Sequence, residues 1–253
     1  MELFEAVFNP STVYGSFYLN AKAVLEYKDL ETLKKEKPEM FLLWNNISDK
    51  LYSQTTPHHS YNINAVNYPE FTKLVCVTYG TLSFDGEGNL KRNIKQIVND
   101  DEVSVLKSLY DVLNQVSVSE KGPKTICGHG VKDYIIPLIV KRYLKNMGEM
   151  TEEQTKFPTI LKSVLNSKPW NSSKMIDVID VWRFNGVGRS SIQLISEFMG
   201  LKKNVELMSN QKISEYYWEN IGKSPEKTLK NISLQSANEL NLVVQLMYKL
   251  RKV

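Results

Sequence analysis

Cysteine is scarce in this chain of 253 residues, which carries only Cys76 and Cys127. Two cysteines cannot form a disulfide scaffold, and they cannot supply the paired cysteine motifs of structural zinc sites. A chain of this length buries roughly three quarters of its unfolded surface, so it can build a core without covalent staples. Because both cysteines lie in apolar runs, we expect two reduced thiols inside that core.

Long apolar runs are missing as well. No stretch reaches the ~20 consecutive apolar residues that a membrane span requires. The acidic opening Met1-Glu2-Leu3-Phe4-Glu5 is unlike a secretory signal peptide. We therefore expect a cytoplasmic protein with no membrane partner.

Two common catalytic signatures are also absent, the Gly-x-Ser-x-Gly nucleophile elbow and the glycine-rich phosphate loop with its Lys-Ser/Thr. Of the three histidines, His58 and His59 fall in a polar stretch that reads as a loop, and His129 follows an apolar segment. We interpret His129 as a structural hydrogen-bonding residue rather than a ligand. Asp177 and Asp180 lie three apart and could share a helix face, but such pairs are more commonly solvated or locally bonded than catalytic.

The charge balance is mildly basic. Lysine and arginine number 32 against 28 acidic residues, a net charge of +4 with a pI near 8.8. This balance is compatible with a nucleic-acid partner without requiring one. The content of 42% hydrophobic and 24% charged residues is that of a folded soluble protein and excludes a largely disordered chain.

The hydrophobic pattern predicts one α/β domain over residues 1–253, in which residues 1–70 hold the first strand and a divergent insertion. Strands are expected at 13–25, 73–84, 90–97 and 124–128, with a hairpin turn at 85–89 and a strand or helix entry at 175–182. Helices are expected at 30–51 with an interruption at Pro38, and at 103–113, 131–147, 192–199, 212–220 and 234–250. Residues 149–172 read as a long loop excursion.

Six sequence blocks occur in an order and at a spacing that resemble a known family. They are residues 68–77 (YPEFTKLVCV), 127–137 (CGHGVKDYIIP), 168–170 (KPW), 176–184 (IDVIDVWRF), 191–201 and 212–218. Together they resemble the DnaQ-like 3′→5′ exonucleases related to the proofreading domain of family B DNA polymerases, over nearly the whole chain. The resemblance implies a ribonuclease H-like fold, a mixed five-stranded sheet flanked by helices on both faces.

In that family, four carboxylates from three motifs hold two divalent ions for phosphodiester hydrolysis. Carried over position by position, Tyr18 and Asn20 stand where the first motif has its two acids. In the second motif, Gly130 replaces an asparagine and Ile135 replaces the acid. In the third, Gln235 replaces the orienting tyrosine, and Glu239 keeps the acid. One carboxylate cannot hold two divalent ions, so the resemblance implies a degenerate catalytic site with no metal and no cofactor, its pocket partly refilled by apolar packing.

We therefore expect a catalytically inactive, exonuclease-like protein that binds the ends of DNA or RNA, or else a replication or phage structural protein. A basic strip for phosphate contacts is predicted at Lys132, Lys141, Arg142 and Lys145, and a solvated helix face is the competing interpretation. Tyr18, Tyr134 and Trp182 could stack on bases, although core packing is the commoner role of such residues.

Two alternatives stay open. The first is an active metal-dependent 3′→5′ exonuclease that uses Mg²⁺ or Mn²⁺ at a rearranged acidic site, Asp133, Asp177, Asp180 and Glu239. The second is an unrelated structural role, such as a component of a phage particle. Relatives of the family occur in bacteria and their phages, so the cytoplasm of a bacterial cell or of a phage-infected host is the expected location.

Overall fold

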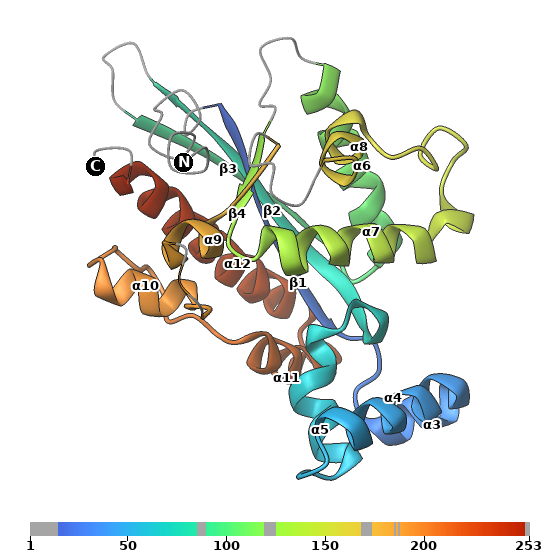
Figure 1. Cartoon of the computed structure of the whole chain (residues 1–253). Coiled ribbons are helices and arrows are strands. Elements are labelled where there is room, and N and C mark those ends of the chain that lie inside the picture. The colour runs from blue at the N-terminus through green and yellow to red at the C-terminus, as the bar shows by residue number, and fades with distance from the viewer. Residues whose placement is uncertain are drawn as a thin grey trace.

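The computed structural model describes residues 15–84, 90–118, 125–167, 174–184, 186 and 188–250. Within them, five strands form one mixed sheet in the order β3-β2-β1-β4-β5, with helices on both of its faces (Figure 1). The strands are β1 (Ser16–Leu25), β2 (Thr72–Phe84), β3 (Leu90–Val98), β4 (Thr125–Gly128) and β5 (Met175–Asp177). Central β1 is antiparallel to β2 and parallel to β4, and β4 is parallel to β5. The predicted α/β class and the mixed five-stranded sheet are confirmed.

Each face of the sheet carries its own helices. The helices over one face are α6 (Glu102–Val118), α7 (Ile136–Lys145) and α8 (Thr159–Leu165). Those on the other side are α9 (Val178–Arg183), α10 (Ile192–Phe198), α11 (Asn210–Asn220) and α12 (Pro225–Leu250). A π-helical turn at Val131–Ile135 leads into α7, and the short 3-10 turn Met147–Glu149 follows it.

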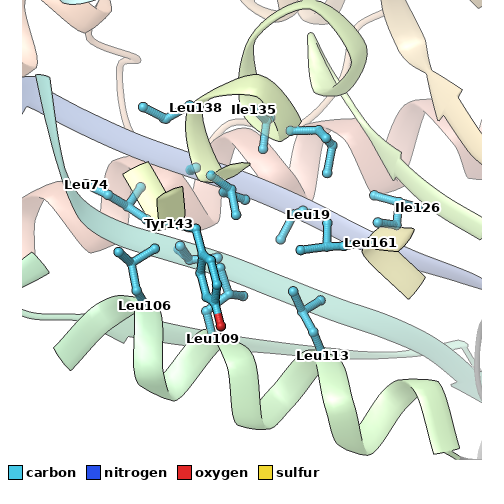
Figure 2. Close-up of a cluster of buried hydrophobic side chains, with 14 of the residues drawn as sticks. Leu19, Leu74, Leu106, Leu109, Leu113, Ile126, Ile135, Leu138, Tyr143 and Leu161 are labelled. Atoms are coloured by element: carbon cyan, nitrogen blue, oxygen red, sulfur yellow. The ribbon is translucent and has the colours of Figure 1, made fainter. Parts of the chain in front are cut away.

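Strand β1 is buried at all 10 of its positions and divides the core into two layers. Side chains alternate along a strand, so residues two apart share a face. Leu19 and Ala21 pack with α6, α7 and α8, the layer drawn in Figure 2. Tyr18 packs instead against α12 in the second layer. The alternation therefore assigns Tyr18, Asn20 and Lys22 to the side of α12.

The connection between β1 and β2 is a helical insertion made of α3 (Leu30–Glu36), α4 (Pro38–Leu51), α5 (Pro57–Asn64) and two 3-10 turns, Ala65–Asn67 and Pro69–Phe71. Its core is aromatic. The ring of fully buried Trp44 lies 5.5 Å from that of Tyr61 and 5.2 Å from that of Phe71, both edge-on. Edge-to-face pairs of this kind stabilise a core beyond the area they bury. The predicted N-terminal insertion is thus a folded unit with its own hydrophobic cluster.

Several predicted elements differ from the structure. Residues 149–172 are not a continuous loop, because α8 lies within them, and the two histidines placed in a loop lie in the first turn of α5. Residues 175–182 were expected to form a strand or the start of a helix, and they form both: β5 ends at Asp177 and α9 begins directly after it. The last helix starts at Pro225, earlier than predicted. The hairpin turn at 85–89 and the block 168–170 lie outside the described residues.

The two thiols are confirmed as free and buried. Burial raises the pKa of Cys76 to about 11, and both burial and the nearby Asp177 carboxylate raise the pKa of Cys127. Neither is therefore a reactive thiolate at neutral pH. None of the helices in the described part of the chain has both the length and the apolar composition that a membrane crossing needs.

Gly128, at the end of β4, lies against the backbone of β1. A Cβ atom at this position would come within 2.5 Å of the Leu19 carbonyl oxygen. Because that contact is with backbone, we expect Gly128→Ala to push β4 from β1 and to lower the free energy of unfolding by about 1–3 kcal/mol. Urea denaturation measures this change. Gly148→Ala is the control, since nothing lies within 4 Å of its Cβ position, and equal losses in the two variants would contradict the steric argument.

Candidate functional site

An open groove of about 610 Å³ lies where β1, the turn after β4, and helices α9 to α12 meet. Its polar and charged lining comes from strand β1, from the turn after β4 and the π-helical turn, from the segment before α10 and the starts of α10 and α11, and from α12. These residues include Asn20, Lys22, His129, Asp133, Arg189, Ser191, Gln193, Ser209, Asn210 and Glu239. Ile135, Ile179, Ile192 and Leu207 supply apolar wall. The groove is therefore amphipathic, and its charged residues come from segments far apart in the sequence.

Glu239 and Lys22 form an ion pair at the base of this groove. The Lys22 ammonium contacts the Glu239 carboxylate, and their side chains are only 6% and 17% exposed. The Asn20 amide donates to the same carboxylate over 3.3 Å. Burial alone would raise the pKa of Glu239, but the Lys22 ammonium, His129 and the Asn20 amide together hold it below its ordinary value. Glu239 is thus a charged carboxylate that already has a cation.

A buried polar ladder connects this pair to the sheet. The Asn20 amide donates to both the carbonyl and the hydroxyl of Ser236, each over 3.2 Å. The Thr78 hydroxyl donates to the same Ser236 hydroxyl over 2.8 Å. These bonds join β1 and β2 to α12, so Asn20 and Glu239 are positioned by the packing of α12 on the sheet. Buried polar groups satisfied in this way fix one relative placement of strand and helix.

The turn after β4 brings His129 to the groove. Gly130 adopts φ +71°, a left-handed conformation that favours glycine, and the π-helical turn begins at the next residue. The Asp177 carboxylate accepts hydrogen bonds from the backbone N–H groups of Gly130 and Lys132, each over 2.9 Å. His129 Nε2 lies 2.8 Å from the Ser190 carbonyl oxygen. His129 has the structural hydrogen bond expected of it, and it also lines the groove.

The carboxylates of the rearranged acidic site do not come together. Asp177 is 4% exposed and caps α9 through the N–H of Ile179 as well as holding the turn after β4. Asp180 pairs with Lys132 over 3.2 Å and with Arg183. Asp133 pairs with Arg189 over 2.8 Å. Each is engaged in a local structural bond, and only Asp133 and Glu239 of the four line the groove.

The positions predicted from the family resemblance have different environments. Tyr18 is 1% exposed in the core, where burial raises its pKa well above the usual value, and it does not line the groove. Ile135 is 2% exposed yet forms part of the groove wall. Gln235 accepts from the Met208 N–H and donates to the Glu206 carbonyl, both over 3.0 Å, so it fixes the segment before α11. Tyr18 is therefore part of the packed core, but a groove with charged walls stays open beside Ile135.

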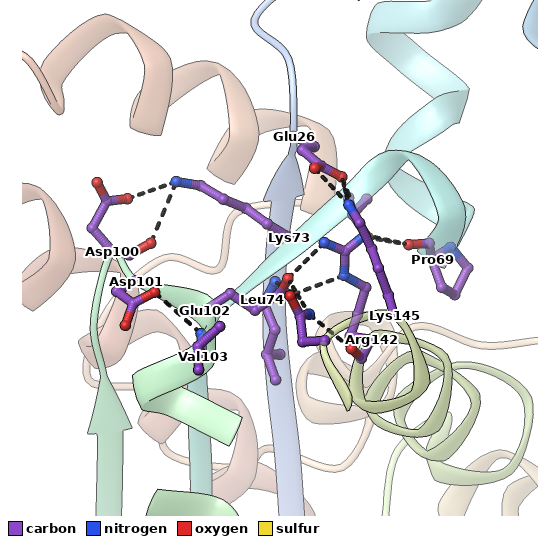
Figure 3. A network of polar contacts seen from close by, with 12 residues as sticks. Glu26, Pro69, Lys73, Leu74, Asp100, Asp101, Glu102, Val103, Arg142 and Lys145 are labelled. Carbon is purple, nitrogen blue, oxygen red and sulfur yellow. Dashed lines mark hydrogen bonds and ion pairs between the residues drawn. The ribbon is translucent and has the colours of Figure 1, made fainter. Parts of the chain in front are cut away.

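The structure does not bring the four predicted basic residues together as one exposed strip. Arg142 is 2% exposed and binds Glu102 through two hydrogen bonds of 2.8 and 2.6 Å (Figure 3). Lys145 and Lys141 lie at the surface beside it, paired with Glu26 and Glu70. Lys132 extends toward α9. The α7 cations therefore belong to an ion-pair network on the side of the helical insertion.

The residues present do not fit a divalent metal. Among the described residues, no three His, Cys, Asp or Glu side chains gather as a ligand set. Glu239 faces an ammonium rather than further carboxylates, whereas hard divalent ions require several oxygen ligands. The groove can instead offer amide, hydroxyl and cationic donors to an anionic or polar ligand.

Lys22 is one of the site residues that the sequence analysis missed, together with Arg189, Gln193 and Asn210. The first motif of the family has acids at two positions, and the position-by-position comparison stopped at the second of them, Asn20. Because side chains alternate along β1, Lys22 lies on the same face as Tyr18 and Asn20, and a lysine inside a largely apolar strand was the available signal. Its partner could not be read in the same way, because Glu239 comes from the last helix.

No protein-family model matches the chain, and no curated protein matches its sequence. The chemistry of the groove is therefore the basis on which its function is inferred.

Proposed function

We propose that this protein is a non-catalytic member of the ribonuclease H-like, DnaQ-like exonuclease group, and that it binds nucleic-acid ends in the groove. A mixed five-stranded sheet with helices on both faces is the architecture that the resemblance implies. Five of the six blocks correspond to strand β2, the turn after β4, strand β5 with α9, and helices α10 and α11, and the block 168–170 lies outside the described residues. This arrangement supports the proposal at the level of the fold.

The observation that carries the proposal is the Lys22–Glu239 ion pair. Active relatives concentrate negative charge in the groove and offset it with two metal ions. Here one of the four family carboxylates remains, Glu239, and the side-chain ammonium of Lys22 neutralises it. Asp133 is likewise paired with Arg189, so the ionised carboxylates of the lining are matched by cations. A phosphodiester chain can approach such a groove without a metal to screen it.

Hydrogen-bond donors in the groove suit a phosphate backbone. Asn210 presents a side-chain amide, the Gln193 amide also lines the groove and donates to Glu206, and Arg189 is 65% exposed at the rim. The N-terminus of α11 also opens on the groove at Ser209 and Asn210, where the helix dipole favours negative charge. Contacts of these kinds fix the phosphate backbone without reading base sequence.

We expect the purified protein to bind a fluorescently labelled single-stranded oligonucleotide in Mg²⁺ or Mn²⁺ without degrading it. Because the contacts are with phosphates, affinity should fall steeply as salt rises. Arg189→Ala should weaken binding and lower the slope of log K against log[salt] by about one. Fluorescence anisotropy measures binding, and a denaturing gel detects cleavage.

Lys141→Ala is the matched control, because Lys141 is an exposed, ion-paired cation away from the groove. It should leave affinity close to that of the unaltered protein. Degradation abolished by EDTA and by Glu239→Ala would show an active nuclease and would overturn the proposal. An absence of binding at low salt would also overturn it, in favour of a protein partner.

A further inference from the structure

An exposed aromatic surface lies on α9 and α10. Phe198 is 78% exposed and Phe184 is 53% exposed, and both contact half-buried Trp182, at ring-centroid distances of 5.8 and 6.0 Å. These three residues are called the aromatic ledge. Leu194, 60% exposed, lies one helical turn before Phe198 on the same face of α10. Contiguous exposed apolar side chains mark binding surfaces more than singly scattered ones do.

Trp182 anchors the ledge to the core. Trp182 packs against the core layer formed by α10 and α12, so its ring cannot fold away. Phe184 has φ +47°, a left-handed conformation that favours glycine and is unusual for a bulky residue. Such conformations persist where the surrounding structure maintains them, and they cluster at functional sites. Phe184 thus occupies a helix end where glycine would be the ordinary choice.

The ledge continues from the groove. Ile179 lines the groove, and Trp182 lies one turn further along the same face of α9. On the other side, Ser191, Ile192 and Gln193 line the groove and begin α10, whose last residue is Phe198. A ligand that leaves the groove between α9 and α10 therefore passes over the ledge.

Cations surround this path. Lys132 and Arg183 share Asp180, and Arg189 pairs with Asp133, so the three cations outnumber the two carboxylates that bind them. Flat aromatic faces beside an excess of positive charge are the surface that unpaired nucleotides recognise, since bases stack on the rings and phosphates contact the cations. Bases within a duplex are already stacked on each other and cannot use such a surface.

We infer that the aromatic ledge stacks the bases of a single-stranded segment whose phosphate backbone enters the groove. The inference rests on the proposed function, because the groove must bind nucleic acid for the ledge to receive the bases. It adds a specific requirement: the ligand must be single-stranded and must carry bases.

The test compares two oligonucleotides of about 12 nucleotides, a length within the site sizes of single-strand binders. One is oligothymidylate, and the other is an abasic chain with the same number of phosphates. We expect oligothymidylate to bind to the full-length protein about tenfold more tightly, the effect of stacking one base. Phe198→Ala should remove this preference and leave the affinity for the abasic chain unchanged.

Phe198 is so exposed that its replacement leaves the core intact, and an unchanged thermal melting curve checks this. Leu51→Ala is the control, because Leu51 is an exposed apolar residue on α4, away from the groove. Equal affinity for the two oligonucleotides would show that the ledge does not stack bases, and it would still be consistent with phosphate binding in the groove. A Phe198→Ala variant that loses affinity for both equally would also overturn it. Binding of neither oligonucleotide would overturn the proposed function itself.

Discussion

Replacing Arg142 with methionine is expected to lower the free energy of unfolding by about 3–5 kcal/mol, the usual cost of breaking a buried ion pair. The Arg142 guanidinium binds the Glu102 carboxylate through two bonds and also reaches Glu26 and the Pro69 carbonyl, at 3.2 and 3.3 Å. Methionine fills similar space but leaves Glu102 as a buried charge without its cation. Thermal melting should show a decrease of about 10 °C, at roughly 2–4 °C per kcal/mol for a chain of this size.

Glu102 joins this ion pair to other elements. Its carboxylate also accepts the Leu74 backbone N–H over 2.6 Å and the Asn146 amide over 3.0 Å. The network therefore ties β2 to α7 and to the start of α6. Lys141→Met is the matched control on the same helix, since its pair with Glu70 is about half exposed and should contribute at most about 1 kcal/mol. Equal melting temperatures for the two variants would contradict the assignment.

Glu239→Gln is expected to destabilise the protein by about 3–5 kcal/mol, because it leaves the Lys22 ammonium buried without a counter-charge. Lys22→Met should have a similar effect, since it leaves the carboxylate alone beside Asn20. Urea denaturation of the two single variants and of the double variant Lys22→Met/Glu239→Gln gives their coupling. The double variant should lose less than the sum of the single losses, because neither unpaired charge remains. Additive losses would show that the two side chains do not act as a pair.

The Lys22–Glu239 pair also makes the stability of the folded protein depend on pH. The folded-state pKa of Glu239 lies below its usual 4.5, so the unfolded chain takes up the proton more readily. The stabilisation is therefore fully present above about pH 4.5 and is lost as pH falls through the lowered folded-state pKa. Glu239→Gln should flatten this part of the stability curve, and a variant that kept the unaltered acid dependence would assign it to other carboxylates.

The pattern of apolar residues was sufficient to predict most of the strands, whereas their assembly into one mixed five-stranded sheet was predicted from the family resemblance. Strands β2 and β4 are apolar and β-branched runs beside clear turn or break signals, and β3 was predicted as the returning strand of the hairpin. The predicted ends of all three lie close to those observed. Helix α8 was missed because it has only seven residues and lies in a polar, proline-containing stretch. A single helical turn or two gains most of its stability from packing, which a local pattern does not show.

The helical spacing of Arg142 indicated that its side chain is buried, but the residue was predicted to be exposed. It lies four residues after Leu138 and three after Ile139, both buried, so helical periodicity assigns it to the inward face of α7. Lys141 and Lys145 lie four apart on the outward face. These basic residues were interpreted as one surface, although residues that are close in the sequence of a helix point in different directions around its axis.

The candidate site was predictable in part. The positions of Asn20, Ile135 and Glu239 came from a resemblance, and the structure places all three on one groove. The pairing of Lys22 with Glu239 required the packing of α12 against β1, which joins residues far apart in the chain. The aromatic ledge likewise depends on which face of α10 the core leaves uncovered.

The helical insertion has a consequence for how the chain reaches this structure. Its two ends meet in the sheet, where Leu25 pairs with Thr72 and the Glu26 N–H donates to the Phe71 carbonyl over 2.9 Å. Pairing β1 with β2 therefore means closing a long loop, and the entropic cost of closure rises with loop length. The aromatic contacts around Trp44 join α4, α5 and the residues just before β2, so they form over much shorter separations in the sequence. Leu25 and Leu33 belong to the same cluster, so we expect that its formation ahead of the sheet brings the ends of β1 and β2 together and lowers the cost of pairing them.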